Sequence, residues 1–503
     1  MNLLTKLEKS KTCWFLLGII VLFFFLRLPS LIEPNWYGDE GIYQVLGQAM
    51  HSGRMLYSEA WDNKPPFLYI TYALFDGDQF WVRSASLIVG LLSLIIFFFL
   101  SKRLLKNAPV AVLTSLLFTL LFATPLIEGN IANAENFILL PVIAAGFLIY
   151  RLVDKQKQFT VLTPRWALLI AGVLLGVAFL FKIVAIFDFA TMLFFLVLVG
   201  LPKHFSKGIH TQLVWIRPLL HQFLFLTAGF LLPVIVTCLY FFATNTFDSF
   251  IQAVLFGNIG YVGYGNKLII PQGFLILKIL LLLISMIILF LKRNSLSRPA
   301  LFILVWFGFS VFNAFFSQRP YTHYLLVMVP SWCLLVGLIL ITKQVREKLL
   351  LIVLFLISTA TLVAGFHLSG YMKKVLYYQN AILFVTEKKD ITSYQAFFDG
   401  KTPRDYEVAS FIKLHTNKND VVFVWGDNAQ IYSLSGTLPP NKYTVAYHIR
   451  GSNQAIRETQ QSLNTLRPKY VIILAEAPSF PFSLDSYLKT FSLERATIYE
   501  RTF

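Results

Sequence analysis

Long apolar runs recur along the chain from Cys13 to His367, each near the roughly twenty residues that a helix needs to cross a bilayer. Short polar connections separate them, so the pattern predicts a polytopic α-helical membrane protein. We expect about eleven spans, at residues 12–32, 82–100, 108–124, 135–152, 166–187, 189–201, 219–242, 273–291, 299–317, 322–342 and 349–367.

The pattern changes after residue 367, where short β-rich runs alternate with segments of helical spacing. The β-rich runs are Val421–Trp425 and Tyr470–Leu474, and the helical segments are Asp405–His415 and Asn453–Leu466. Because strands and helices alternate, we expect a sheet flanked by helices. The sequence therefore predicts a transmembrane domain over residues 1–367, with a long first loop at 33–81, and an α/β domain over residues 368–503.

Composition agrees with a membrane protein. Hydrophobic residues make up 56% of the chain and charged residues only 14%, whereas soluble domains carry about 25% charged residues. The formal net charge of +17 could indicate nucleic-acid binding, but Lys and Arg gather in short clusters between the apolar runs. Such clusters report membrane topology, so we expect contact with membrane lipids and no nucleic-acid partner.

Alternate connections carry most of the basic residues, which the positive-inside rule assigns to the cytoplasm. They are Lys6, Lys9, Lys11, Lys102, Arg103, Lys106, Arg151, Lys155, Lys157, Arg165, Lys203, Lys207, Arg217, Lys292, Arg293, Arg298, Lys343, Arg346 and Lys348. The opposite connections hold few basic residues and most of the acidic ones. We therefore predict a cytoplasmic N-terminus, an extracytoplasmic C-terminal domain, and carboxylate chemistry on the outer face of the plasma membrane.

The first outer loop combines an amphipathic segment with clustered charges. Its apolar stripe consists of Ile42, Val45, Leu46, Ala49 and Met50. This spacing predicts a helix that lies along the outer membrane surface. Asp39 and Glu40 fall at its start, where a helix N-terminus favours ionised carboxylates. Asp39 could therefore serve as a base or a ligand, or it could be only the N-cap of the helix.

Four other polar residues lie in outer connections or at outer ends of spans. Glu135 opens the fourth span and is either a cap or a second acid of one site. Lys64 precedes Pro65-Pro66, which cannot continue a helix and which force the chain into an extended conformation. Lys64 could therefore bind a lipid phosphate, or it could snorkel to the interface. Between the ninth and tenth spans, Arg319 could bind an anion or form an ion pair, and His323 could be a ligand, a base or neither.

Three more cationic residues, Arg27, Arg83 and Lys182, also lie at outer ends of spans. Long cationic side chains at such positions can snorkel to the headgroups. Only Lys182 has a nearby acid in the sequence, Asp188, as an alternative partner.

These residues resemble a known group of enzymes. Asp39-Glu40, the amphipathic helix, Gly53 to Tyr57 and Lys64-Pro65-Pro66 together resemble the first outer loop of bacterial lipid-linked-sugar glycosyltransferases. Those enzymes belong to the C-type superfamily, with the lipid A aminoarabinose transferases and the protein O-mannosyltransferases. Ala134-Glu135 resembles the second acidic motif of these enzymes. The stretch 321–330 resembles the start of one of their late spans, and the stretch 421–440 resembles part of their outer domain.

The resemblance implies a glycosyltransferase that uses a polyprenyl-phosphate-linked sugar as donor and inverts the anomeric centre. The acceptor would be a lipid, a glycan or a protein. Carried over to this chain, Asp39 is the candidate base, and Glu40 and Glu135 shape the acceptor or metal site. Some relatives bind a divalent metal ion and others need none, so a metal cofactor stays an open expectation.

Contacts to the donor phosphate follow from the same resemblance, with Lys64 as the first candidate and Arg319 and His323 as further ones. The alternative is a transporter or flippase of lipid-linked sugars. Transporters often show repeated halves and ionisable residues near mid-span, whereas this sequence shows no internal repeat and gathers its ionisable residues at outer span ends. These features favour the enzyme.

Overall fold

The computed structural model describes residues 11–155, 165–202, 209–267, 272–366 and 371–502. The chain forms two compact units. The first, here the bundle unit, comprises Met1–Leu28, Ala85–Tyr240 and Asn258–Lys374, and the second, here the loop–tail unit, comprises Pro29–Ser84, Phe241–Gly257 and Val375–Phe503. The predicted boundary after residue 367 lies outside the described residues, as do Lys6, Lys9, Lys157, Lys203 and Lys207 of the predicted cytoplasmic set.

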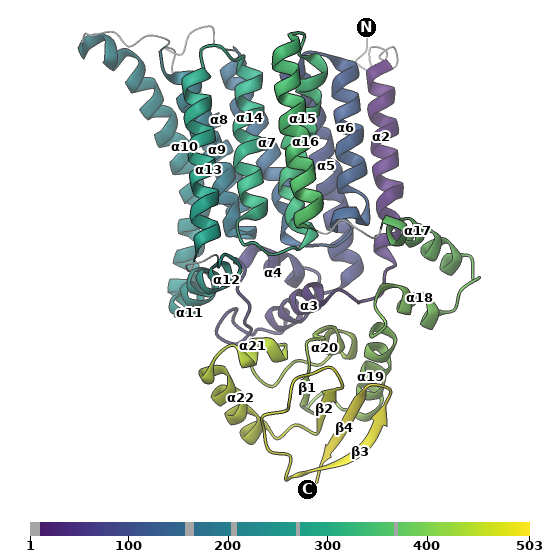
Figure 1. The fold of residues 1–503 in the computed structure, drawn as a ribbon. Helices are drawn as coiled ribbons and strands as arrows, with labels where there is room; N and C mark the ends of the chain where they lie inside the picture. Colours follow the sequence, from purple (N-terminus) through teal and green to yellow (C-terminus); the bar gives the residue numbers. More distant parts are fainter. Residues whose placement is uncertain (1–10, 156–164, 203–208, 268–271, 367–370, 503) are drawn as a thin grey trace, which may run out of the picture. The chain divides into compact units, whose positions relative to one another are not determined.

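Apolar helices build the bundle unit and run side by side (Figure 1). They are, in whole or in part, α2 (Lys11–Arg27), α5 (Gln79–Leu105), α6 (Ala108–Phe122), α7 (Ala134–Lys155), α8 (Arg165–Phe181), α9 (Ile186–Gly200), α10 (Ile209–Ala243), α13 (Gly273–Lys292), α14 (Arg298–Phe315), α15 (Val329–Ile341) and α16 (Val345–Gly365). The unit also contains α12 (Gly257–Gly265) from Asn258 on and the start of α17 (Tyr371–Val385), which do not belong to this parallel set. In the described part of the chain, nine helices are long and apolar enough to cross a membrane, and α6 and α8 are shorter apolar helices. The predicted multi-pass helical architecture is confirmed, while the count of eleven spans stays a prediction.

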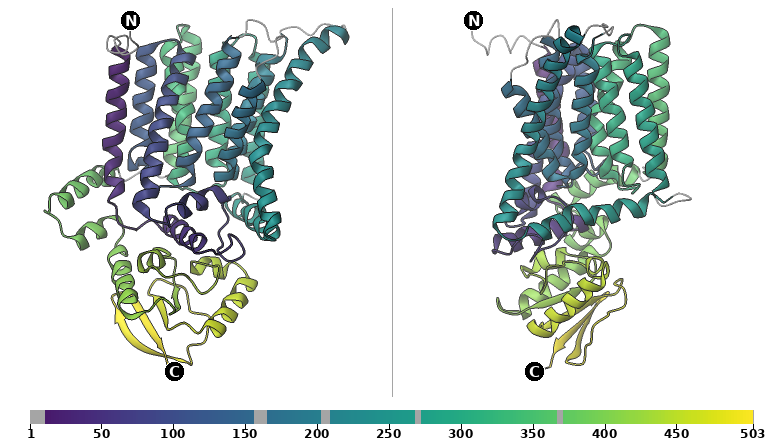
Figure 2. Two further views of the ribbon diagram at one scale, coloured as in Figure 1. Left: turned by 180° about the vertical axis from the view of Figure 1, so that it is seen from behind. Right: turned by 90° about the vertical axis from the view of Figure 1, so that its left-hand side faces the viewer.

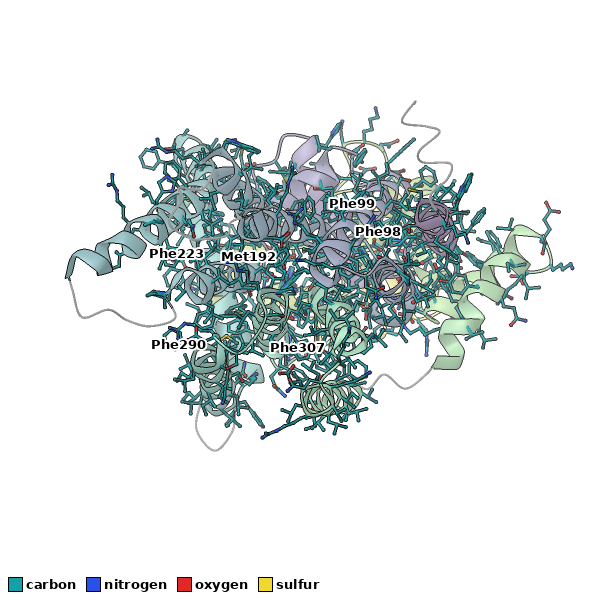
Figure 3. The ribbon with its side chains drawn as sticks, turned by 90° about the horizontal axis from the view of Figure 1, so that it is seen from above. Phe98, Phe99, Met192, Phe223, Phe290 and Phe307 are labelled. Atoms are coloured by element: carbon teal, nitrogen blue, oxygen red, sulfur yellow. The ribbon has the colours of Figure 1, made fainter. Side chains whose placement is uncertain are left out.

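Large apolar side chains fill the spaces between these helices. Figure 3 looks along the helix axes and labels Met192 of α9 and Phe307 of α14, two buried residues on helices that pack against each other. In contrast, α13 buries only Met286, and α16 buries no residue at all. Their apolar side chains remain on the outside of the unit, as expected of helices that face lipid.

The loop–tail unit joins the first loop to the C-terminal α/β domain. Its helices are α3 (Gly38–His51), α4 (Pro66–Ala73), α11 (Phe247–Ile251), the π-helical η4 (Gln252–Phe256), α18 (Ile391–Phe398), α19 (Thr402–His415), α20 (Gln430–Ser435), α21 (Ala446–Arg450) and α22 (Asn453–Leu466). Its strands are β1 (Val422–Trp425), β2 (Tyr470–Leu474), β3 (Tyr487–Leu493) and β4 (Ala496–Arg501). They form one sheet in the order β1-β2-β4-β3, with β1 and β2 parallel and the other neighbours antiparallel. Figure 2 shows β3 and β4 as the yellow hairpin near the C-terminus.

Helices cover both faces of this sheet. Tyr470 of β2 contacts Phe411 of α19, whereas its neighbour Val471 belongs to the apolar cluster that contains Ala455 of α22. Successive strand residues point to opposite faces, so α19 and α22 lie on different sides. The predicted strands and helices of the tail are confirmed as β1, β2, α19 and α22. The hairpin β3–β4 was not predicted, because most of β3 is exposed and mixes polar with apolar residues.

Candidate active site

The predicted first-loop helix is α3, and it carries Asp39 in its first turn. Tyr37 occupies the N-cap position, so Asp39 is not the N-cap residue. Asp39 Oδ2 accepts a hydrogen bond of 3.0 Å from the Tyr43 hydroxyl and lies 3.6 Å from Lys64 Nζ. The Asp39 side chain remains 38% exposed, so a ligand can reach its carboxylate.

Close packing on several sides holds α3 in place. Glycines make this possible, since a Cβ atom on Gly41 would lie 2.7 Å from the Gln430 nitrogen of α20. A Cβ atom on Gly47 would lie 2.8 Å from the carbonyl carbon of Tyr72 in α4. The helix is therefore buried beyond its apolar stripe, Glu40 included, which differs from the exposed polar face expected of a helix on a membrane surface.

Two buried tyrosines fix the backbone at Lys64. The Tyr57 hydroxyl donates to the Lys64 carbonyl at 2.8 Å, and the Tyr69 hydroxyl accepts from the Lys64 N–H at 3.2 Å. Pro65 is extended as predicted, but Pro66 opens α4, where proline is favoured because its φ suits the first helical turn. Lys64 therefore stands at a rigid junction rather than in a flexible loop.

Asp39, Asp62 and Lys64 form a group that we call the loop cluster. The Lys64 ammonium lies 3.6 Å from Asp39 and 3.7 Å from Asp62, which is longer than a hydrogen bond. Asp62 is buried and accepts hydrogen bonds of 2.7 Å from the Tyr69 hydroxyl and from the Asn63 N–H. Burial raises the pKa of the Tyr69 hydroxyl well above its usual range, so this group remains a donor. The cluster holds one cation between two acids, 3.6 and 3.7 Å from their carboxylates.

Glu40 lies beside Asp39 in the sequence but in a closed environment. Arg83 donates to both oxygens of Glu40 and lies 2.9 Å from Glu33 Oε2. Tyr377 donates to the other oxygen of Glu33 at 2.6 Å. Arg83, Glu33 and Glu40 are all buried, so Arg83 does not take the snorkelling position that its place at a span end allows. Two acids inside the unit provide the partners that the membrane interface would otherwise supply.

A second group, here the bundle cluster, consists of Glu128, Glu135, Lys182 and His323 in the bundle unit. Lys182 Nζ donates to Glu135 Oε1, and His323 Nε2 lies 3.8 Å from the same oxygen. His323 Nδ1 lies 2.9 Å from Glu128 Oε2, and Thr322 donates to the other Glu128 oxygen. None of the four side chains is more than 21% exposed. This cluster is closed by direct contacts.

The bundle unit also corrects two expectations about basic residues. Lys182 pairs with Glu135 and not with Asp188, whose carboxylate accepts a hydrogen bond of 3.1 Å from Trp306. Arg27 is completely buried and donates hydrogen bonds within the unit, so it does not snorkel. In both cases the cationic side chain forms hydrogen bonds with residues distant in the sequence instead of extending to the membrane interface.

The six predicted site residues divide between the two units. Asp39, Glu40 and Lys64 belong to the loop–tail unit, and Glu135, Arg319 and His323 belong to the bundle unit. The structure brings Asp39 and Lys64 together in the loop cluster, and Glu135 and His323 together in the bundle cluster. Arg319 is half-buried shortly before the 3₁₀ helix η5 (Thr322–Met328).

Three candidate residues were not predicted as site residues from the sequence. Asp62 stands next to Asn63-Lys64, and an acid so close to the candidate cation was the available signal. Glu128 and His448 had no local signal, because their partners are distant in the sequence: 195 residues separate Glu128 from His323. His448 of α21 places Nε2 3.8 Å from Asp62 Oδ1.

Two further observations concern possible ligands. In the described residue ranges, no group of three or more His, Cys, Asp or Glu side chains is arranged to hold a metal ion. The loop–tail unit contains a cavity of about 500 Å³, lined by Arg54, Lys413 and neighbouring tail segments but by none of the predicted site residues. The predicted site residues of this unit therefore lie outside this cavity.

Known proteins resemble the chain in sequence and in fold. The sequence profile of a family described as dolichyl-phosphate-mannose-protein mannosyltransferase matches residues 64–227, a stretch that begins at Lys64. No curated protein sequence matches the chain significantly. The fold is that of a polytopic membrane protein similar to ArnT from Cupriavidus metallidurans, solved with bound undecaprenyl phosphate, at 15% identity and a TM-score of 0.54 over 97% of this chain and 98% of that chain.

Two more solved structures extend the comparison. ArnT from Cupriavidus metallidurans in the apo state matches at 13% identity and a TM-score of 0.50, over 97% of this chain and 98% of that chain. The archaeal oligosaccharyltransferase AglB from Archaeoglobus fulgidus, with an inhibitory peptide and a dolichol-phosphate, matches at 12% identity over 93% of this chain and 70% of that chain, with a TM-score of only 0.46. The family profile and the ArnT fold confirm the predicted resemblance to the polyprenyl-phosphate-sugar transferases of the C-type superfamily.

Proposed function

We propose that this protein is a membrane glycosyltransferase that moves a sugar from a polyprenyl-phosphate donor to an acceptor on the extracytoplasmic face, with inversion. The loop cluster carries the proposal, because it combines an accessible carboxylate with a cation 3.6 Å away. Asp39 is 38% exposed, while the neighbouring Glu40 is buried against Arg83. The family match, which starts at Lys64, supports the reaction class.

In the proposed reaction Asp39 is the general base. Its carboxylate takes the proton of an acceptor hydroxyl as the acceptor oxygen forms a bond to the anomeric carbon of the sugar. The bond from that carbon to the phosphate oxygen breaks, and the polyprenyl phosphate leaves with the electron pair. A base must lie within hydrogen-bond reach of the proton that it removes, which the exposure of Asp39 permits.

Lys64 is the proposed contact for the donor phosphate. Negative charge grows on that phosphate as the bond breaks, and a preorganised cation lowers the free energy of the transition state. The Lys64 ammonium lies 3.6 and 3.7 Å from the carboxylates of Asp39 and Asp62 and 4.8 Å from the centre of the Tyr43 ring, so a donor phosphate would meet a cation that is already held in place. Glu40 acts as a positioning residue in this proposal, because it anchors α3 through Arg83.

Glu135, Arg319 and His323 keep the roles that the resemblance assigns to them, at the acceptor and at the donor phosphate, as part of the proposal. The topology is part of it as well, with the N-terminus in the cytoplasm, the C-terminal domain outside, and the plasma membrane as location. An ArnT structure holds undecaprenyl phosphate, which supports a lipid-linked donor here. A flippase of lipid-linked sugars would need no general base, so the variant below separates the two functions.

The test replaces Asp39 with Asn, which removes the base and changes little volume. Turnover with a polyprenyl-phosphate sugar should fall by about 10²- to 10⁴-fold, while the melting temperature and the affinity for the donor stay near their wild-type values. Glu59→Gln is the matched control, since Glu59 is an exposed acid of the same loop. Near-normal turnover by a well-folded Asp39→Asn protein would exclude Asp39 as the base.

A further inference from the structure

The tail of the loop–tail unit is attached to the segment that carries Asp62 and Lys64. The Trp61 N–H donates to the Lys442 carbonyl at 2.9 Å, and the Trp61 ring packs against the apolar cluster of the sheet. The same ring meets the His448 ring edge-to-face at a centroid distance of 4.9 Å. The residue directly before Asp62 is therefore held by the tail and not by the first loop.

His448 of α21 is an unusual histidine in this environment. Only 9% of it is exposed, and its Nδ1 is buried without a hydrogen-bond partner. Its Nε2 lies 3.8 Å from Asp62 Oδ1, just beyond hydrogen-bond length. Burial lowers the pKa of His448 to about 4, so the ring is neutral near pH 7 and has one N–H to donate. Buried polar groups in native proteins nearly always have a hydrogen-bond partner, so the unpartnered Nδ1 of His448 is an exception that calls for an explanation.

The two oxygens of Asp62 are divided between the loop and the tail. Oδ2 accepts from the Tyr69 hydroxyl and lies 3.7 Å from the Lys64 ammonium. Oδ1 accepts from the Asn63 N–H and faces His448. A proton on Nε2 of the neutral His448 would face Oδ1, while Oδ2 is the oxygen beside the Lys64 ammonium.

We propose that His448 is a positioning residue of the donor-phosphate site, acting through Asp62 on Lys64. The C-terminal domain is then part of the binding machinery and not only an appended domain. This inference rests on the proposed function, because it assumes that Lys64 binds the phosphate of the lipid donor. The inference assigns a role to His448, which lies nearly 400 positions after Asp62 in the sequence.

Binding of undecaprenyl phosphate alone to the purified full-length chain in detergent is the test, because it needs neither the sugar nor the acceptor. His448→Ala should weaken this binding by roughly three- to tenfold, as is typical of coupled neighbouring residues. His448→Gln should restore most of the affinity, since its amide nitrogen reaches about as far as Nε2. His448→Asn should not, since its amide nitrogen ends near the position of Nδ1. Tyr447→Phe, on the same short helix but half exposed, is the matched control.

The expected pattern includes non-additivity: His448→Ala should change little in an Asp62→Asn background. If His448→Ala does not fold, the comparison of the Gln and Asn variants still decides the question, because both preserve a polar side chain. Wild-type affinity in His448→Ala, equal effects of Gln and Asn, or additive effects with Asp62→Asn would overturn the inference and leave the proposed function standing. A wild-type chain that does not bind undecaprenyl phosphate would overturn both, and Lys64→Met binding as wild type would overturn the assumption on which the inference rests.

Discussion

The loop cluster and the bundle cluster contain the same kinds of groups and differ in how tightly those groups are engaged. In the bundle cluster Lys182 donates directly to Glu135, whose side chain is only 3% exposed. In the loop cluster Lys64 stays 3.6 Å from Asp39, whose side chain is 38% exposed. The two clusters have similar compositions, but the bundle cluster is buried with a direct Lys–Glu hydrogen bond, whereas the loop cluster is partly exposed with longer ion pairs.

This difference indicates which charged residues stabilise the fold and which are available for catalysis. A buried, closed ion pair fixes a helix position, and removal of one partner leaves an uncompensated buried charge. In the loop cluster the Asp39 carboxylate is exposed, so it can exchange contacts with the cluster for contacts with a ligand. On these grounds the loop cluster is the better candidate for chemistry, and the bundle cluster has first to release a contact before it can bind a ligand.

The largest stability effect is expected from breaking the closed cluster. Lys182→Met should destabilise the protein by about 3–5 kcal/mol, because Glu135 would remain buried without its cation. The melting temperature in detergent measures this loss. Lys106→Met is the control, since Lys106 is an exposed lysine with an ion pair of 3.7 Å to Asp154 in the same unit. A Lys182→Met protein as stable as Lys106→Met would contradict the distinction between the clusters.

A smaller, pH-dependent effect is expected beside the open cluster. Burial lowers the pKa of His448 from 6.5 to about 4, so the unfolded chain takes up a proton at a pH where the folded protein does not. His448 therefore does not lower the free energy of unfolding above pH 6.5, but it lowers that free energy by up to about 3 kcal/mol as the pH falls from 6.5 toward 4. In melting curves between pH 7 and pH 4, His448→Gln should lose less stability than the wild type. Parallel pH profiles for the two proteins would contradict the burial of a neutral histidine.

The smallest stability effect is expected for Lys64→Met. Both ion pairs of Lys64 are longer than hydrogen bonds, and the buried Asp62 keeps its hydrogen bonds from Tyr69 and from the Asn63 N–H, so the loss should be smaller than for Lys182→Met. Affinity for a polyprenyl phosphate should nevertheless fall, while Lys64→Arg should keep part of it because the charge remains and the geometry changes. A large drop in melting temperature with unchanged lipid binding would reverse the roles assigned to the two clusters.

Local patterns in the sequence were sufficient to predict most elements of the fold. Apolar runs predicted the membrane helices, and the apolar stripe of Ile42, Val45 and Leu46 predicted α3. The strands β1 and β2 were predictable because they are short, β-rich and buried. The hairpin β3–β4 was not, since Tyr487–Leu493 exposes most of its side chains and lacks a clear alternation.

The candidate site was only half predictable. Asp39 and Lys64 belong to one loop, and their clustering follows from local spacing and from the family resemblance. The state of each charge depended on contacts that no local pattern reveals, such as Arg83 with Glu40 or His448 with Asp62. The rim position of Arg83 suggested snorkelling, because a sequence does not show which acids will surround a cation after folding.

In the proposed reaction the donor is a lipid-linked sugar that is used on the outer face of the membrane. Purified protein in detergent is supplied in separate reactions with polyprenyl-phosphate sugars and with nucleotide sugars. Each reaction contains an acceptor mixture from membrane lipids and surface glycans, and the glycosylated product is measured. We expect transfer from a polyprenyl-phosphate sugar, lost in Asp39→Asn and retained in Glu59→Gln. Transfer from a nucleotide sugar in the absence of any polyprenyl carrier would contradict this account.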